Sequence, residues 1–268
     1  MKKTGLLFSL LLFSFLVFAQ TDETSDTTEV EPDYNFTSGI SWLNSNLNNG
    51  IDLGGGSLFI FSNELSHSSG LYLNLTPSFL NAEWYNLSSS IGYDYEFSEW
   101  FSVNGEYSYL TYSDDSLNSY ASYNHLFSFS GDFELPFDLS IGVTTDYYPG
   151  THSALNIGAA VSGFYRFESL IFIPMLSADF VSQDIKNQFL KTSKKQKGKN
   201  GGLSASTTGY TSVSGLSNVG IHVIFIYPIF DNFKIVLHPL YQFTPKSELS
   251  KSDSQFNISI GIKYSLDF

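Results

Sequence analysis

The sequence predicts an all-β fold, a closed antiparallel transmembrane β-barrel of about twelve strands. Three observations lead to this prediction. Apolar and polar side chains alternate with a period of two along most of the chain, the alternating segments mostly reach 11 residues or more, and tight connections alternate with longer ones. Charged residues make up only 15% of the chain, against about 25% in ordinary soluble domains. The chain therefore has fewer charged residues than a surface in contact with water normally carries.

The alternation is clear between residues 87 and 97, where Leu87, Ile91 and Phe97 share one face and Ser88 and Asp94 the other. Successive strand residues point to opposite faces, so such segments separate two different environments. The predicted strands cover approximately residues 34–44, 52–62, 70–80, 84–97, 100–112, 119–134, 137–148, 154–167, 169–182, 216–230, 233–244 and 254–268.

Alternation alone would also fit a soluble β-sandwich, whose strands have one polar face. The segment lengths favour membrane strands, which need about 9–11 residues. Connections such as 98–99 and 231–232 are tight, whereas 113–118 is longer, as expected for short turns opposite long loops. Aromatic residues beside the tight turns predict an interfacial girdle. They are Phe97, Trp100, Phe101, Phe133, Phe137, Phe167, Phe230, Phe233 and Phe268.

The strand number should be even, because both ends of the barrel segment are expected on the side of the tight turns. Two connections fit this arrangement less well. The segment 64–69 is long for a turn, and 81–83 is short for an outer loop. Barrels of ten or fourteen strands therefore remain open alternatives.

The last predicted strand alternates strictly from Phe256 to its terminal residue, Phe268. It resembles the final strand of Gram-negative outer-membrane β-barrel proteins, in which the assembly machinery reads the end of the strand as an insertion signal. The resemblance implies an outer-membrane location, with the membrane lipids and the barrel-assembly machinery as partners. It also implies an assembly signal at Tyr264, Leu266 and Phe268. No specific family within this class is indicated.

The N-terminal segment supports export. Residues 1–19 read as a cleaved signal peptide, with Lys2 and Lys3 before an apolar run that is shorter than the ~20 residues of a spanning helix. Residues 20–33 are acidic and nearly free of apolar side chains, which predicts a disordered periplasmic tail. The barrel should occupy 34–268, with a long outer loop at 183–215. The chain has no cysteine, so disulfides are excluded.

Charge is distributed unevenly, with no Lys or Arg between Thr4 and Tyr165. The alternation places a set of ionisable residues on the polar face of the strands, where they are candidates to line the lumen. The set contains Asp94, Glu96, Glu106, Asp132, Glu134, Asp138 and Asp146, with Arg166 and Lys263 as counter-ions. A water-filled lumen with this excess of carboxylates would favour cations. Alternatively, the carboxylates are paired, hydrated near the rims, or protonated in a plugged interior.

Most other basic residues cluster in the predicted outer loop. They are Lys186, Lys191, Lys194, Lys195, Lys197 and Lys199. Such lysines could bind lipopolysaccharide phosphates as mobile point charges, or could simply be solvated. Nucleic acid is not an expected partner, because the net charge is −13 and no basic, aromatic-rich surface is apparent elsewhere.

The sequence predicts no catalytic residue, no metal ion and no cofactor. The five histidines are scattered, and none has metal-ligand spacing or a nucleophile motif beside it. The best local arrangement is Asp146, His152 and Ser153, and chance supplies such neighbours in a chain this rich in serine.

Taken together, these features predict a narrow passive channel or porin for small solutes or cations, since large aqueous pores need about 16–18 strands. A structural or adhesive, ligand-binding barrel with a plugged lumen is the alternative. An outer-membrane enzyme is the third reading. The sequence does not indicate which solute would be transported.

Overall fold

The structure is a computed structural model that describes residues 32–44, 47–48, 51–52, 57–112, 124–150, 153–186, 210–245 and 253–268. The predicted signal peptide and nearly all of the predicted acidic tail lie outside the described residues. Within the described part of the chain, no helix is long and apolar enough to cross a membrane.

Twelve long strands form one sheet in the described residues. One of the twelve consists of β10 (Ala154–Gly163) and β11 (Tyr165–Phe167), which are interrupted only at Phe164 and share the neighbour β12. The other eleven are β1 (Tyr34–Leu43), β4 (Leu58–His67), β5 (Leu71–Leu80), β6 (Glu83–Ser98), β7 (Phe101–Tyr112), β8 (His125–Leu135), β9 (Leu139–Tyr148), β12 (Leu170–Lys186), β13 (Tyr210–Phe230), β14 (Phe233–Thr244) and β15 (Asp253–Asp267). Two short strands, β2 (Leu47–Asn48) and β3 (Ile51–Asp52), pair separately.

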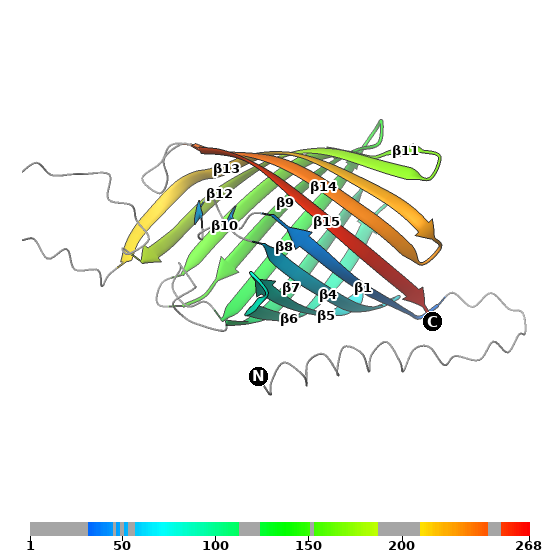
Figure 1. The fold of residues 1–268 in the computed structure, drawn as a ribbon, viewed down its shortest axis with the longest axis horizontal. Coiled ribbons are helices and arrows are strands. Elements are labelled where there is room, and N and C mark those ends of the chain that lie inside the picture. Colours follow the sequence, from blue (N-terminus) through cyan, green and yellow to red (C-terminus); the bar gives the residue numbers. More distant parts are fainter. Residues whose placement is uncertain are drawn as a thin grey trace, which may run out of the picture. The chain divides into compact units, whose positions relative to one another are not determined.

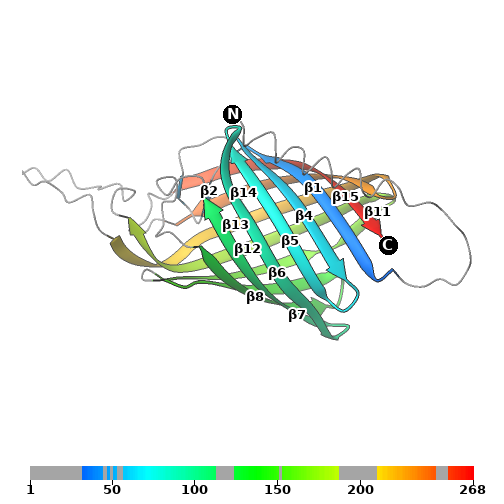
Figure 2. The same ribbon diagram turned by 90° about the horizontal axis from the view of Figure 1, so that it is seen from below.

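The large sheet closes into a barrel with every neighbouring pair antiparallel (Figures 1 and 2). Strand β12 pairs with β10, and β1 pairs with both β4 and β15, so the described sheet leaves no long edge strand unpaired. The amide of Tyr34 donates to the Phe268 carbonyl at 3.0 Å, and the Phe268 amide donates back at 2.9 Å. Closure satisfies the backbone without water, as a strand-built membrane protein requires. The predicted twelve-stranded barrel is confirmed.

Short turns gather at the end of the barrel where Phe268 lies, which we call the turn end; the opposite end is the loop end (Figure 1). One tight turn lies instead at the loop end. There, Asn81 and Ala82 join β5 to β6 with φ angles of 51° and 65°, the backbone of a two-residue hairpin turn. This turn accounts for the unusually short outer connection noted in the sequence.

The strand predicted at 52–62 is displaced, because β4 runs from Leu58 to His67 and leaves only residues 68–70 as the turn. The error arises at Asn63, a polar residue among the apolar positions of the strand. Its Oδ1 accepts from Ser38 Oγ at 2.9 Å, and its Nδ2 donates to the Leu75 carbonyl at 3.4 Å. These neighbours satisfy the amide, so the strand continues through it.

The outer connection predicted at 183–215 is also shorter in the structure. Strand β12 continues to Lys186 and β13 begins at Tyr210, with Gln183 opposite Val213, so the connection is 187–209. Backbone pairing does not need apolar side chains, and a polar hairpin can therefore extend the strands beyond the apolar belt. Periodicity of hydrophobicity could not reveal this extension.

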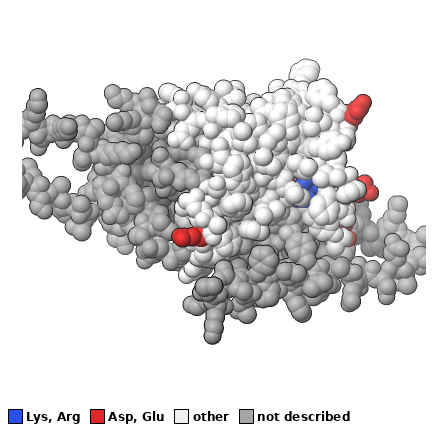
Figure 3. Space-filling model, in the orientation of Figure 1, with Lys and Arg blue, Asp and Glu red and all other residues white. Residues whose placement is uncertain are grey.

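The outer surface of the barrel is apolar. On β5, Leu71, Leu73 and Leu75 expose 44–50% of their surface, whereas the intervening Tyr72 exposes 8%. The same outward row on β6 contains Ile91 and a run of aromatic residues. Figure 3 shows a broad face of the barrel almost free of charged side chains, with the few carboxylates near its edges. An apolar outer wall and a polar inner wall are the arrangement of a membrane-spanning barrel.

Candidate functional site in the barrel interior

The inner wall near the turn end carries a hydrogen-bonded cluster of polar side chains from β5, β6 and β7. Tyr72 Oη donates to Glu106 Oε2 at 3.0 Å, and Asn104 Nδ2 lies 2.9 Å from Tyr72 Oη. The same Asn104 nitrogen donates to Asp94 Oδ1 at 2.7 Å, while Ser108 Oγ donates to Glu106 Oε1 at 2.7 Å. The cluster holds two carboxylates in fixed positions on the wall.

A glycine makes this geometry accessible. Tyr72 lies opposite Gly92, and Gly92 lies opposite Glu106 on the next strand. A Cβ atom placed on Gly92 would be 2.2 Å from Tyr72 Cζ, so the tyrosine ring occupies the space that a side chain would fill. The bare backbone at this position lets the ring lie along the wall and reach a carboxylate two strands away.

The negative charge of this region is not neutralised locally. Asp94 and Glu106 receive hydrogen bonds from neutral amide and hydroxyl groups, and no ion pair involving them occurs among the described residues. Glu64 on β4 interacts electrostatically with both carboxylates and also with Lys263. Glu64 was absent from the predicted lumen set because it fell in a predicted turn. Extending the alternation of the predicted strand by two residues, from 62 to 64, would have found it.

The remaining predicted acidic residues are spread over neighbouring strands. Glu96 lies on β6, Asp132 and Glu134 lie on β8, and all three are exposed. Asp146 on β9 accepts from Ser128 Oγ at 2.7 Å. Asp138 lies in the turn between β8 and β9 with a φ of 56°, where strand alternation does not define a facing direction. Asp138 therefore lies outside the strands, and its predicted place in the lumen stays a prediction.

Basic residues occupy a different arc of the same end. Arg166 lies on β11, and Lys234 on β14 stands directly opposite Lys263 on β15. The predicted acidic residues that lie within strands are on β6–β9, so most of them are on other strands than these three basic residues, although Glu64 on β4 is close enough to Lys263 to interact electrostatically. Arg166 and Lys263 are the predicted counter-ions, whereas Lys234 was not predicted, although its place just after a tight turn could have suggested it.

A second polar group contains two of the histidines. Ser177 Oγ lies 2.8 Å from His222 Nε2, and His222 Nδ1 lies 3.1 Å from His238 Nε2, with the two rings stacked at 5.3 Å. Pairing of β13 with β14 brings together residues 16 positions apart. Among the described residues, no group of three or more His, Cys, Asp or Glu is placed to hold a metal ion.

Burial of the inner wall changes along the barrel. Near the loop end, Val181, Gln183, Asn218, Thr244 and Asn257 expose only 1–7% of their surface. Near the turn end, charged residues of the inner wall are exposed, among them Asp94, Asp132 and Lys263. On the arc formed by β12–β15, the inner wall is therefore packed toward the loop end, whereas several charged residues are exposed toward the turn end.

Several predicted residues lie outside this region. Lys186 is the last residue of β12, whereas Lys191, Lys194, Lys195, Lys197, Lys199 and His152 lie outside the described residues. In the predicted assembly signal, Tyr264 and Leu266 belong to β15, and the Phe268 ring stacks on Tyr34 at 5.9 Å.

A closed antiparallel barrel with an apolar outside and an ionisable inside defines an outer-membrane β-barrel. No protein-family description matches the chain, and no curated protein matches it. Solved structures similar to it include a KdgM porin in complex with disordered oligogalacturonate, at 11% identity and a TM-score of 0.49, covering 87% of this chain and 99% of the porin. The NanC porin gives 9% identity and a TM-score of 0.47, covering 87% of this chain and 100% of the porin. An outer-membrane channel from Pseudomonas putida F1 has 10% sequence identity and a TM-score of 0.49, covering 91% of this chain and 100% of the channel.

Proposed function

We propose that this barrel is a narrow passive channel for small solutes, with a preference for cations. The proposal rests on the acidic inner wall near the turn end. Asp94 and Asp132 are exposed there. Among the described residues, Asp94 and Glu106 have only neutral hydrogen-bond partners. Charged side chains that face a water-filled passage lower the entry barrier for ions of opposite sign.

The strand number supports a narrow passage. Barrels of about 8 strands have interiors filled by side chains or one small ligand, whereas wide aqueous channels need about 16–18 strands. With twelve strands, the described barrel falls between these sizes. The packed wall near the loop end is the natural constriction, and a solute would meet the acidic wall between this constriction and the turn end.

The constriction itself is polar enough to hold water. Gln183 Nε2, Asn218 Oδ1 and Asn257 Oδ1 are buried without a hydrogen-bond partner in the described part of the chain. A buried amide atom left without any partner costs about 1–3 kcal/mol. Hydration would remove this cost, so the composition of this layer favours a wet constriction over a dry one.

Ion selectivity of the refolded protein in a planar lipid bilayer tests the proposal. In a salt gradient, the wild-type barrel should give stable conductance steps with a cation-selective reversal potential. The double variant Asp94→Asn, Glu106→Gln should conduct with a reversal potential shifted toward zero. Both replacements keep an acceptor oxygen for Asn104 and Tyr72, so the wall geometry is retained. An unchanged reversal potential in a conducting variant would remove the cation preference.

A plugged structural or ligand-binding barrel is the second candidate, and the packed loop end favours it. A folded barrel that shows no conductance in the bilayer at any salt concentration would support this second candidate and contradict the channel.

The predicted lysine cluster would then be the first place to seek a partner. Replacing its six lysines with Gln should weaken binding to vesicles containing lipopolysaccharide, and unchanged affinity would eliminate that interaction.

A further inference from the structure

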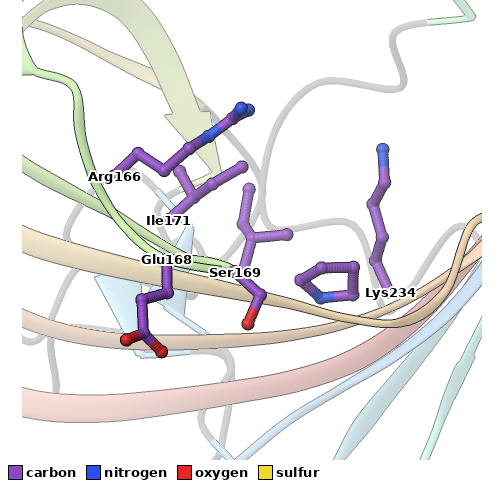
Figure 4. Close-up of a pocket in the computed structure, with 7 residues that line it drawn as sticks. Arg166, Glu168, Ser169, Ile171 and Lys234 are labelled. Atoms are coloured by element: carbon purple, nitrogen blue, oxygen red, sulfur yellow. The ribbon is translucent and has the colours of Figure 1, made fainter.

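A small pocket opens at the turn end between β11, β12, β13 and β14. Its volume is about 230 Å³, and its lining includes Arg166, Lys234 and Glu168 together with Ile171 and Ile226. Figure 4 shows the Arg166 and Lys234 side chains extending in the same general direction from the two sides of the pocket, whereas the Glu168 carboxylate points the other way. Two cationic groups therefore border a space whose floor is apolar.

Neither the Arg166 nor the Lys234 side chain makes an ion pair or a hydrogen bond in the described part of the chain. Lys234 also stands directly across from Lys263. Like charges directly opposite on neighbouring strands destabilise a sheet. An anion bound between Arg166 and Lys234 would relieve this repulsion, which makes the pocket electrostatically suited to a negative ligand.

The floor of the pocket restricts the kind of anion. Ile171 and Ile226 are directly paired across β12 and β13, and Pro228 continues the same apolar surface. A cavity of about 150 Å³ lined by apolar side chains is large enough for benzene. The pocket therefore has room for a ring or a short aliphatic chain beside a carboxylate, and its surface offers each part a complementary neighbour.

We propose that this pocket binds a small organic anion that joins one carboxylate to an apolar group of about the size of an aromatic ring. Arg166 would bind the carboxylate through its planar guanidinium fork, and Lys234 would contribute a point charge. The apolar group would lie on Ile171 and Ile226. The proposal concerns binding alone and holds whether or not the barrel conducts.

Benzoate is a suitable probe, measured by saturation-transfer NMR and calorimetry on the refolded protein in an uncharged maltoside detergent at low salt. We expect an affinity on the order of millimolar, as befits a ligand of this size. Acetate, which lacks the ring, and benzyl alcohol, which lacks the charge, should each bind at least about fivefold more weakly. Equal binding of either compound would overturn the assignment of ligand class.

Charge-matched variants locate the site. Arg166→Gln and Lys234→Gln should each weaken benzoate binding about tenfold, the usual effect of losing one charge-assisted hydrogen bond. Lys186→Gln, which removes a positive charge at the loop end, should change it less than about twofold. Glu168→Gln, which removes the negative charge that borders the pocket, should not weaken benzoate binding, in contrast to the loss expected from Arg166→Gln and Lys234→Gln. Benzoate binding that is unaffected by Arg166→Gln and Lys234→Gln in folded protein would refute the site.

Discussion

Replacing Gly92 with alanine should destabilise the barrel by about 2–4 kcal/mol. The new Cβ would lie 2.2 Å from Tyr72 Cζ and 2.3 Å from its hydroxyl oxygen, whereas carbon atoms in contact are normally about 3.5–4.0 Å apart. An overlap of this size forces the tip of the Tyr72 ring to move away from Gly92. Its hydrogen bond to Glu106 is then lost, which costs about 1.5–3 kcal/mol for a charged acceptor, and displaced packing adds to that cost.

A double-mutant cycle isolates this interaction. In a Tyr72→Ala background the obstructing ring is absent, so Gly92→Ala should cost less than about 0.5 kcal/mol. Gly105→Ala on β7 is the matched control, because nothing lies within 4 Å of its added Cβ, and it should be neutral or slightly stabilising. Urea unfolding in lipid vesicles, followed by the fluorescence of the three tryptophans, measures all four variants. If Gly92→Ala costs the same with and without Tyr72, the proposed contact between ring and glycine is wrong.

Two further predictions concern the barrel itself. Ile260→Arg places a charge on a side chain that is 46% exposed on the outer wall, and should cost about 2–4 kcal/mol in the same unfolding assay, whereas Ser88→Arg on the inner wall should cost less. Equal penalties would contradict the assigned faces. Ala82→Gly should stabilise the barrel by roughly 0.5–1 kcal/mol, because Ala82 has a φ of 65° that glycine adopts without strain, a gain partly offset by the entropy of the unfolded chain. A loss of stability would show that this turn is not strained.

The sequence predicts most of the strands because their alternation is regular. The boundaries 233–244 coincide with β14, and the first strand differs from β1 by one residue. The prediction fails for β4, where one outward polar residue, Asn63, is satisfied by neighbouring strands that a single segment does not reveal. It fails again at the ends of β12 and β13, where polar residues extend the ladder.

The candidate site was less accessible from sequence. The alternation of positions along one strand was enough to assign acidic residues to the inner face. The contacts of Tyr72 with Gly92 and of His222 with His238 depend instead on the register between neighbouring strands. That register is fixed by the whole ring of neighbours. Glu64 and Lys234 were missed for simpler reasons. Glu64 lay in a predicted turn that is in fact part of β4, and Lys234 is the second residue of β14, directly after a tight turn.

The pairing of β1 with β15 has a consequence for how the protein matures. This seam joins residues such as Asn35 and Asp267, which are 232 positions apart and hydrogen-bonded through their side chains. Contacts of such high sequence separation form late, because the entropy of closing the intervening chain must be overcome first. Until then, β1 and β15 each present an unpaired apolar edge that invites aggregation. We therefore expect the chain to be most prone to aggregation before β1 and β15 have paired.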